Sequence, residues 1–454
     1  MKFSKFTIKH YRCFQDMQTL KFAQPNKDKP GSGITFIVGE NNSGKTTLIE
    51  GLFFRDQQKI RGSERQKEGD SEFQLYDSDN SVQRKLKVIR KSSYTLIEDP
   101  KINDSELFEI VPSRRHWHSA ASGMMQIEAV TKATIKETPR VAQANTPIAA
   151  ALKSIEADDM KYKSFIEFVR EVLPEFSSFS IGFEENEYIE YVTNEGVRHK
   201  SDFLGDGVIS ILRILCHLFN KTNRPLVIDE PELSLHPLAQ KRLFKLVAKM
   251  ATERQIIIST HSPYFVSWEY IKNGAILNKI AKHKDLKSEI HQLQDYSTYE
   301  KLIKRANWQQ PFLMDIVAKE IFFHDNILFV EGQEDVGLLR QENDITESVN
   351  LFGYGIRGKD AFVFALQLAK DLGIKKAGVL IDNGCSESEI KNDLDSKFPD
   401  YKIVQWNKED IRDKEPREIK KKVGYFDAEG KKKEEDELDD YYEKIDMLNQ
   451  YFEN

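Results

Sequence analysis

The segment Gly39-Glu40-Asn41-Asn42-Ser43-Gly44-Lys45-Thr46-Thr47 fits the pattern G-x-x-x-x-G-K-[ST] of a phosphate-binding loop. An apolar run at 34–38 precedes it and a helix-compatible run starts at Leu48, which is the strand–loop–helix context that the pattern requires. Glycines let backbone N–H groups close around phosphates, and the N-terminus of the following helix adds partial positive charge. The sequence therefore predicts a nucleoside triphosphate site, with a chance glycine-rich turn as the alternative.

Two side chains of this loop are expected to contact the phosphates and the metal ion directly. Lys45 should reach the outer phosphates, and Thr46 should hold Mg²⁺ through its hydroxyl. The predicted nucleotide-binding residues of the loop are Gly39, Asn41, Asn42, Ser43, Gly44, Lys45, Thr46 and Thr47.

Length and composition bound the remaining interpretation. At 454 residues the chain is too long for one ordinary core, so two or three domains are expected. The net charge of −6 does not indicate a general nucleic-acid binder, and any contact with DNA would need a local basic patch. The three cysteines lie too far apart to suggest a disulfide framework or a zinc site. Since no segment is long and apolar enough to span a membrane, we expect a cytoplasmic protein without a membrane partner.

A pair of carboxylates follows the apolar strand predicted at 225–228. This strand would deliver Asp229 beside the phosphate-binding loop, where it could orient Mg²⁺ through water. Glu230 would then be placed to take a proton from the attacking water. A surface turn after the strand is the alternative.

Two further segments could face phosphate. His261 follows a second apolar strand at 255–260 and could contact the γ-phosphate, or it could cap a turn before Pro263. Leu204-Gly205-Asp206-Gly207 opens a helix and could face phosphate, or it could form a simple capped turn.

Taken in this order, the four motifs resemble those of the ABC-class ATPases. The resemblance implies an α/β head that binds ATP with Mg²⁺, in which Leu204–Gly207 acts as the signature loop and His261 as the switch histidine. In that class the signature of one head completes the ATP site of a second head, so a homo-oligomer built from ATP-sandwiched heads is implied. This signature departs from the usual Ser-Gly-Gly pattern. The chain carries no long heptad array of the chromosome-maintenance type between the loop and the signature.

A second α/β pattern begins at Asn326. One apolar strand ends in Glu331, with Asp335 close behind, and another ends in Asp382. Carboxylates at adjacent strand ends could bind a divalent metal, or they could simply cap parallel strands.

This second pattern resembles the TOPRIM domain, and the order of head, connecting helix and Val-Glu-Gly strand is similar to the OLD family of bacterial anti-phage ATPase–nucleases. A working TOPRIM site normally shows Asp-x-Asp, whereas Asp382 is followed by Asn383 and Gly384. Arg412 stands near Asp410 where a glutamate would help. The domain is therefore expected to be degenerate, with Glu331, Asp335 and Asp382 as its candidate metal ligands.

The expected architecture has three parts. An ABC-type P-loop ATPase head spans 1–285 and carries a mixed helical and hairpin insertion at about 56–200. A helical connector spans 286–322. A degenerate TOPRIM-like α/β domain with a charged C-terminal helix spans 323–454.

Three functions remain open. The chain resembles the ATPase subunit of PARIS-type anti-phage systems, which implies a Mg-ATP switch that holds a separate effector and responds to a phage-encoded trigger protein. A self-contained ATP-regulated DNA endonuclease would use Glu331 and Asp382. A DNA-clamping repair or recombination ATPase would use Arg114 and Arg115 beside Trp117, although that patch could equally be structural.

Overall fold

The computed structural model of the chain describes residues 2–53, 69–88, 95–97, 107–113, 148–183, 187–200, 206–220, 222–282, 287–293, 319–342, 344–353, 359–383, 387–414 and 422–453. The chain forms two compact units, residues 1–290 and 291–454. Both units combine strands and helices, which confirms the predicted mixed α/β class.

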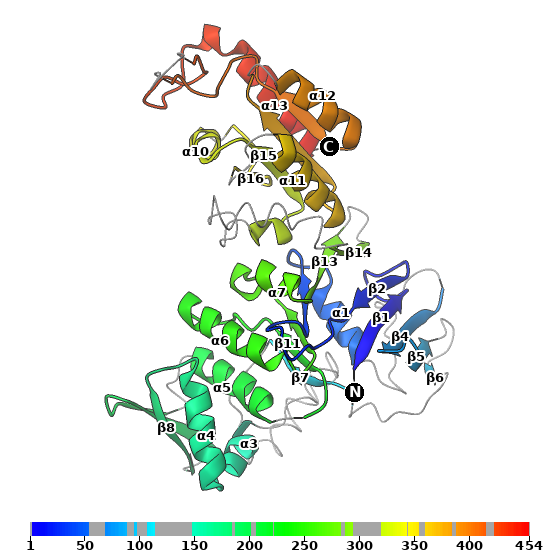
Figure 1. The fold of residues 1–454 in the computed structure, drawn as a ribbon, viewed down its shortest axis with the longest axis vertical. Coiled ribbons are helices and arrows are strands. Elements are labelled where there is room, and N and C mark those ends of the chain that lie inside the picture. Colours follow the sequence, from blue (N-terminus) through cyan, green and yellow to red (C-terminus); the bar gives the residue numbers. More distant parts are fainter. Residues whose placement is uncertain are drawn as a thin grey trace. The chain divides into compact units, whose positions relative to one another are not determined.

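A six-stranded sheet forms the centre of the first unit (Figure 1). Its strands are, in spatial order, β14 (Ser288–Gln292), β13 (Ile276–Lys282), β3 (Ile34–Val38), β12 (Ile256–Ser259), β11 (Leu226–Asp229) and β7 (Glu109–Val111). The pairs from β13 to β7 are all parallel. The continuous apolar runs of β3, β11 and β12 are fully buried, as is usual for parallel strands that are covered on both faces. Because these strands run in one direction, the loops that follow them leave the same edge of the sheet.

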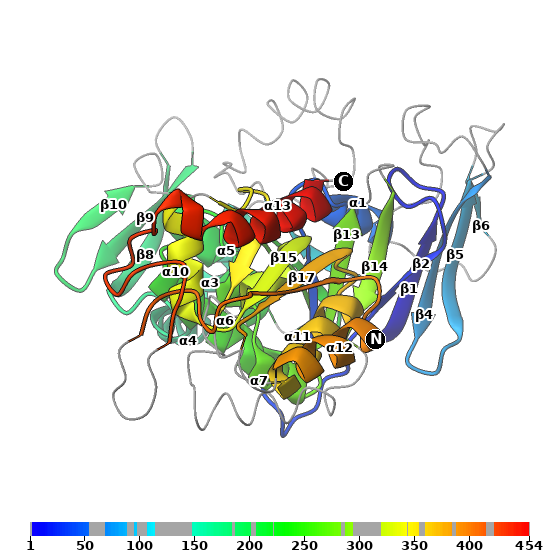
Figure 2. The same ribbon diagram turned by 90° about the horizontal axis from the view of Figure 1, so that it is seen from above.

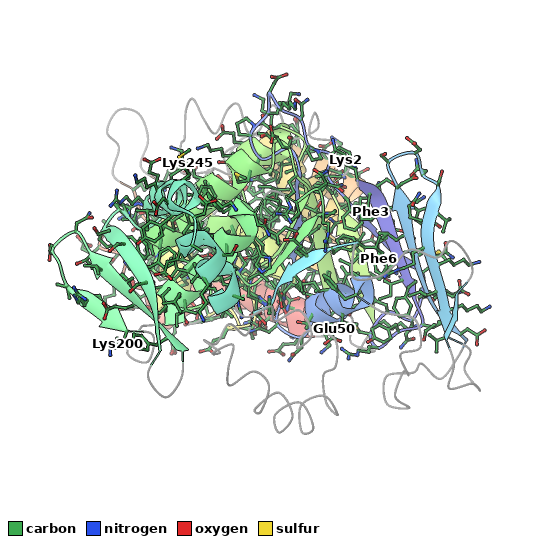
Figure 3. All side chains as sticks on the ribbon, turned by 90° about the horizontal axis from the view of Figure 1, so that it is seen from below. Lys2, Phe3, Phe6, Glu50, Lys200 and Lys245 are labelled. Carbon is green, nitrogen blue, oxygen red and sulfur yellow. The ribbon has the colours of Figure 1, made fainter. Side chains whose placement is uncertain are left out.

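An antiparallel sheet and helix α1 (Lys45–Leu52) enclose the core beside the central sheet. The sheet is built, in spatial order, from β2 (Gln18–Lys21), β1 (Phe3–Lys9), β4 (Ser71–Asp77), β5 (Val82–Val88) and β6 (Thr95–Ile97), which lie side by side in Figure 2. Figure 3 labels Phe3 and Phe6 on β1 and Glu50 on α1, and all three are buried. One apolar cluster joins these two elements to Ile37 and Val227 of the central sheet. The core thus fixes α1, and with it the loop at its start, against the sheet.

Three further helices of the first unit lie next to the central strands in sequence. They are α5 (Asp206–Phe219), α6 (Pro237–Met250) and α7 (Trp268–Lys272), with a 3-10 turn at Pro263–Phe265. α5 precedes β11 and α6 follows it. Pro237 opens α6, where its missing N–H and fixed φ favour the first helical turn.

A small lobe is formed by two helices and a three-stranded antiparallel sheet, grouped together in Figure 1. Its elements are α3 (Ile148–Glu156), α4 (Asp159–Arg170), β8 (Phe176–Phe183), β9 (Glu187–Thr193) and β10 (Arg198–Lys200). The Asp158 carboxylate starts α4 by accepting hydrogen bonds from the backbone N–H groups of Met160 and Lys161.

Side chains of the two lobe helices engage the backbone along the outer edge of β8. The Tyr162 hydroxyl donates to the Phe179 carbonyl at 2.7 Å and accepts from the Phe179 N–H at 3.0 Å. Glu156 accepts from the Ile181 N–H at 3.3 Å, and Arg170 Nε donates to the Phe176 carbonyl at 2.7 Å. The backbone of β8 on the side away from β9 therefore forms its hydrogen bonds with side chains.

The second unit is built on a four-stranded parallel sheet. Its strands are, in spatial order, β16 (Asn350–Phe352), β15 (Asn326–Val330), β17 (Lys376–Ile381) and β18 (Lys402–Gln405). Its helices are α10 (Gln333–Gln341), α11 (Lys359–Asp371), α12 (Glu387–Lys397) and α13 (Asp439–Glu453), with 3-10 turns at Glu320–Phe322 and Glu435–Glu437. Trp406, Tyr425 and Tyr441 stack together at one end of its core. The α/β pattern predicted from residue 323 onward is present, and its TOPRIM-like character stays a prediction.

The predicted connector and the predicted insertion each contain strands that belong to the sheets of the head. β14 lies within the predicted connector, yet it forms the edge strand of the head sheet. β4 to β7 lie within the predicted insertion, yet they belong to the two large sheets of the first unit. Most of the predicted helical connector, residues 294–318, lies outside the described residues. Among the helices that the structure describes, none is both long and apolar enough to cross a bilayer.

Candidate functional site

The loop between β3 and α1 folds back tightly on its own backbone. Gly39 has φ of 147° and Gly44, which caps α1, has φ of 116°, both in the region that favours glycine. A Cβ at Gly39 would lie 2.4 Å from the Ile280 carbonyl oxygen, and one at Gly44 would lie 2.6 Å from Cys13 Sγ. The two motif glycines are therefore required both by conformation and by space. Asn42 also adopts a left-handed conformation, with φ of 61°.

Lys45 points back into this loop. Its Nζ donates to the carbonyl oxygens of Gly39 at 2.9 Å and Glu40 at 2.8 Å. Burial lowers the pKa of Lys45 to about 8, although the nearby charges of Glu230 and Asp229 oppose this shift. A buried ammonium that donates to neutral carbonyl groups is suited to exchange them for phosphate oxygens.

The loop is also hydrogen-bonded to β14, an edge strand of the central sheet. Ser288 of β14 donates from its hydroxyl to the Ser43 carbonyl at 2.6 Å, and both residues are buried. The Ser288 N–H donates to the Cys13 carbonyl at 2.9 Å. The Ser43 hydroxyl itself is buried and has no hydrogen-bond partner among the described residues. One polar group of the cradle thus remains available for a ligand.

Asp229 and Glu230 follow β11 at the same edge of the sheet. Asp229 pairs in register with Ser259 of β12, which pairs in turn with Ile37 of β3. Asp229 is buried, and Glu230 adopts a left-handed conformation with φ of 48°. The Glu230 N–H donates to the Ser259 carbonyl at 2.8 Å, which holds this turn against β12. Such strain in a residue other than glycine is costly and is typical of functional sites.

His261 follows β12 and faces Glu230. Its Nε2 lies 3.7 Å from Glu230 Oε1. Burial, together with the positive charge of Lys45, lowers the pKa of His261 to about 4, so the imidazole is neutral at pH 7. Lys45, Glu230 and His261 therefore lie close enough for their charges to influence one another.

Glu232 is a member of this site that the sequence reasoning missed. Its carboxylate accepts from the His261 N–H at 2.6 Å and from the Thr260 hydroxyl at 2.9 Å. Burial raises the pKa of Glu232, while these two hydrogen bonds oppose the rise. Glu232 thereby joins the turn after β11 to the end of β12. Its position directly after Asp229-Glu230-Pro231 was the available signal.

The predicted signature segment is described only in part. Leu204 and Gly205 lie outside the described residues. Asp206 begins α5, and Gly207 is so close to the turn after β11 that a Cβ there would lie 2.5 Å from the Ser234 carbonyl oxygen. Gly207 thus lies against the turn after β11.

The residues around the loop fit a nucleotide with Mg²⁺. Asn41 in the loop and Thr46 in the first turn of α1 are exposed, Thr47 is half-buried, and Asp229 ends a central strand of the same sheet. A hydroxyl and a carboxylate are the hard oxygen donors that Mg²⁺ prefers. The loop backbone and the helix N-terminus provide positive potential for phosphates.

The second unit gathers its candidate carboxylates at the ends of β15 and β17. The Asp382 N–H donates to Glu331 Oε1 at 3.1 Å, and the Gly332 N–H donates to Asp335 Oδ2 at 2.8 Å. Burial, followed by the charges of Asp410 and Glu331, raises the pKa of Asp335 to about 7. Burial and the charges of Glu331 and Asp335 raise the pKa of Asp382 to about 8. The three predicted residues are therefore neighbours, and Asp410 is a fourth.

Cations of the same unit reach this group. Lys414 Nζ lies 2.7 Å and Lys422 Nζ 3.1 Å from Asp410 Oδ2. Among the residues that the structure describes, no three His, Cys, Asp or Glu side chains are placed to share a metal ion. The basic patch predicted at Arg114 and Arg115 lies outside the described residues.

A known protein family matches the first unit. The family model of the AAA ATPase domain matches residues 1–110 and 71–266. An OLD nuclease of Thermus scotoductus is 32% identical over 111 residues, which cover 24% of this chain and 20% of that protein. An uncharacterised protein of Methanocaldococcus jannaschii is 31% identical over 119 residues, which cover 25% of this chain and 14% of that protein. The chain thus spans a fifth or less of the length of these curated relatives.

Among solved structures, the chain is similar to an SMC head domain from Thermotoga maritima, with 14% identity, a TM-score of 0.40, and coverage of 65% of this chain and 100% of that one. It is also similar to an Smc head domain bound to the C-terminal domain of ScpA from Pyrococcus furiosus, with 12% identity, a TM-score of 0.43, and coverage of 67% and 99%. The matches to the family model run together from residue 1 to residue 266 of 454, more than half of the chain, so this protein belongs to the AAA ATPase domain family.

Proposed function

We propose that the chain binds and hydrolyses Mg-ATP and uses the nucleotide state as a switch in bacterial defence against phage. The observation that carries the ATPase part is the convergence of Lys45, Asp229, Glu230 and His261 at the carboxyl edge of one parallel sheet. Phosphoryl transfer needs little covalent chemistry from a protein, because positioning and charge supply most of the catalysis. This edge offers both.

Each residue would have a distinct task. Lys45 would leave the Gly39 and Glu40 carbonyls and bind the outer phosphates. Thr46 and Asp229 would hold Mg²⁺, which neutralises charge on the phosphates when it is bound. Glu230 would accept a proton from the attacking water, and neutral His261 would sense the terminal phosphate.

We further propose that two heads sandwich ATP and that the resulting oligomer holds a separate effector, which it releases in response to a phage-encoded trigger. The resemblance to ABC-class and PARIS-type ATPases supports this part, as does the relative from Thermus scotoductus, which is named an OLD nuclease. The same name supports a second candidate function, an ATP-regulated DNA endonuclease that uses Glu331 and Asp382.

ATP binding and turnover by the purified chain test the first claim. Lys45→Ala is expected to abolish saturable ATP binding and hydrolysis. The control is Lys249→Ala, because Lys249 is an exposed lysine of α6 that pairs with Glu171 at 3.1 Å, outside the site. Hydrolysis by Lys45→Ala at the parental rate would remove the basis of the proposal.

The switch and the endonuclease make opposite predictions for the chain alone. The switch predicts that plasmid DNA stays intact with Mg²⁺ or Mn²⁺ and that an effector encoded by a neighbouring gene co-purifies with the chain. The endonuclease predicts metal-dependent nicking that Glu331→Gln abolishes. Nicking by the parent, lost in Glu331→Gln, would favour the endonuclease.

A further inference from the structure

We propose that Lys414 and Lys422 are the resident cations of the acidic cluster formed by Glu331, Asp335, Asp382 and Asp410, and that they take the structural place of a divalent metal ion there. The inference concerns the second unit alone and is independent of ATP binding by the first. It assigns the cluster to holding the fold together rather than to metal-dependent chemistry.

Asp410 is the centre of the argument. Its side chain is 1% exposed, so its charge needs compensation within the protein. Lys414 and Lys422 both donate to Oδ2, at 2.7 and 3.1 Å, and the Ile411 N–H donates to Oδ1 at 3.0 Å. Both oxygens of the most deeply buried carboxylate are therefore engaged by the chain itself.

The carboxylates of Glu331 and Asp335 also accept hydrogen bonds from the chain. Glu331 Oε1 accepts from the Asp382 N–H, and Asp335 Oδ2 accepts from the Gly332 N–H. Lys414 also lies 3.2 Å from Glu334 Oε2, which extends the ion-pair network beyond the cluster. A metal ion entering here would have to displace ammonium groups and replace existing hydrogen bonds.

The residue after Asp382 has a structural task as well. Asn383 donates from its amide to the Asn407 carbonyl at 2.8 Å and accepts from Gln405 at 3.3 Å. It thereby joins the end of β17 to the segment after β18. Asn383 is the middle position of the expected Asp-x-Asp pattern, and it therefore fixes the strand ends beside Asp382.

A compact ammonium with three donors suits this task, whereas Mg²⁺ requires near-octahedral oxygen ligands. The two lysines belong to the segments that follow β18, and through Asp410 they hold those segments to the cluster. Removing both ammonium groups would leave four carboxylates with no cation from these positions. Such a group should attract a divalent ion from solution.

Mn²⁺ titration of the nucleotide-free full chain tests the proposal, with free Mn²⁺ measured by electron paramagnetic resonance. All proteins carry Asp229→Asn, so that the head contributes no carboxylate at that position. The parent is expected to show no saturable binding up to about 1 mM Mn²⁺ and no change in melting temperature with EDTA. Lys414→Met with Lys422→Met is expected to gain at least about tenfold tighter binding. Adding Asp382→Asn should abolish that gain.

The matched control is Lys391→Met with Lys397→Met. These lysines of α12 also pair with aspartates, at 2.7 and 2.9 Å, outside the cluster, so this variant should behave like the parent. Saturable binding by the parent that Asp382→Asn removes would overturn the proposal, and so would a folded double variant that gains no binding. If the double variant fails to fold, the parent titration still decides the question.

Discussion

At the scale of single residues, Glu232 explains how the head site keeps its geometry. Its carboxylate receives the His261 N–H and the Thr260 hydroxyl, both from the end of β12. The strained turn at Glu230 lies two residues earlier. A single half-buried side chain therefore ties the histidine to the turn that carries the proposed general base.

We predict that Glu232→Ala lowers ATP turnover by about 10- to 100-fold while ATP affinity changes little, because the residue positions catalytic groups without touching the phosphates itself. Glu232→Gln should retain most of the activity, since its amide oxygen can still accept from the His261 N–H while its NH₂ group donates to the Thr260 hydroxyl. Steady-state turnover and equilibrium nucleotide binding measure the two effects separately. Equal loss in both variants would contradict a positioning role.

Local sequence patterns predicted the site residues that belong to a short motif or that end an apolar run. The glycines and Lys45 lie in one motif, and Asp229 and His261 each end an apolar run. Glu232 and Ser288 were missed, because their roles arise only when strands from distant parts of the chain pair. The hydrogen bonds from His261 to Glu232 and from Ser288 to Ser43 span 29 and 245 positions, and such contacts leave no periodic trace in one sequence.

At the scale of elements, β14 connects the phosphate-binding loop with the chain that leaves the head. Ser288→Ala should weaken ATP binding roughly fivefold, because a buried carbonyl loses a hydrogen bond worth about 1 kcal/mol. Ser288→Thr keeps the hydroxyl and should bind ATP more nearly like the parent. Isothermal titration of all three proteins with ATP checks this. Parental affinity in Ser288→Ala would show that β14 does not support the loop.

A buried ion pair at the other end of the sheet predicts a pH dependence of stability. Glu109 of β7 lies 3.0 Å from Arg254 Nη2 and also meets His217 and Thr222. Burial alone would raise the pKa of Glu109, but the hydrogen bonds from His217 and Thr222 and the charge of Arg254 lower it to about 2 from 4.5. The stabilisation is therefore complete above pH 4.5 and is lost as the pH falls toward 2.

Glu109→Gln should lower the free energy of unfolding at pH 7 by roughly 3 kcal/mol, since Arg254 is left buried without its charge partner. The difference from the parent should shrink between pH 4.5 and pH 3, as followed by urea unfolding. Glu171→Gln, which removes an exposed partner of Lys249, should cost less than about 1 kcal/mol. A difference that stays constant across this pH range would contradict the linkage.

It was easier to predict that a segment forms a strand than to predict which sheet the strand joins. The apolar runs at 34–38 and 225–228 were recognisable alone, yet β4 to β7 looked like an insertion and β14 like a connector. Their place in the sheets depends on partners far away in the chain, such as β1 for β4 and β11 for β7. Hydrophobic pattern predicts that a strand exists, whereas the neighbour is chosen by packing.

At the scale of the whole molecule, the proposed ATP sandwich predicts a change of mass. Glu230→Gln should bind ATP and hydrolyse it about 10²- to 10⁴-fold more slowly, so that the head-to-head state accumulates. Light scattering on this variant should then show a larger assembly with ATP than with ADP. Identical masses in both nucleotides would argue against a sandwich.

The lobe around β8 bears on how such assemblies stay soluble. The backbone of its outer edge is already engaged by Tyr162, Glu156 and Arg170, and the short opposite edge at β10 carries Arg198 and Lys200. Neither edge favours pairing with a strand of another protein through main-chain hydrogen bonds alone. A protein that recognises this lobe is therefore expected to do so through the identity of its side chains.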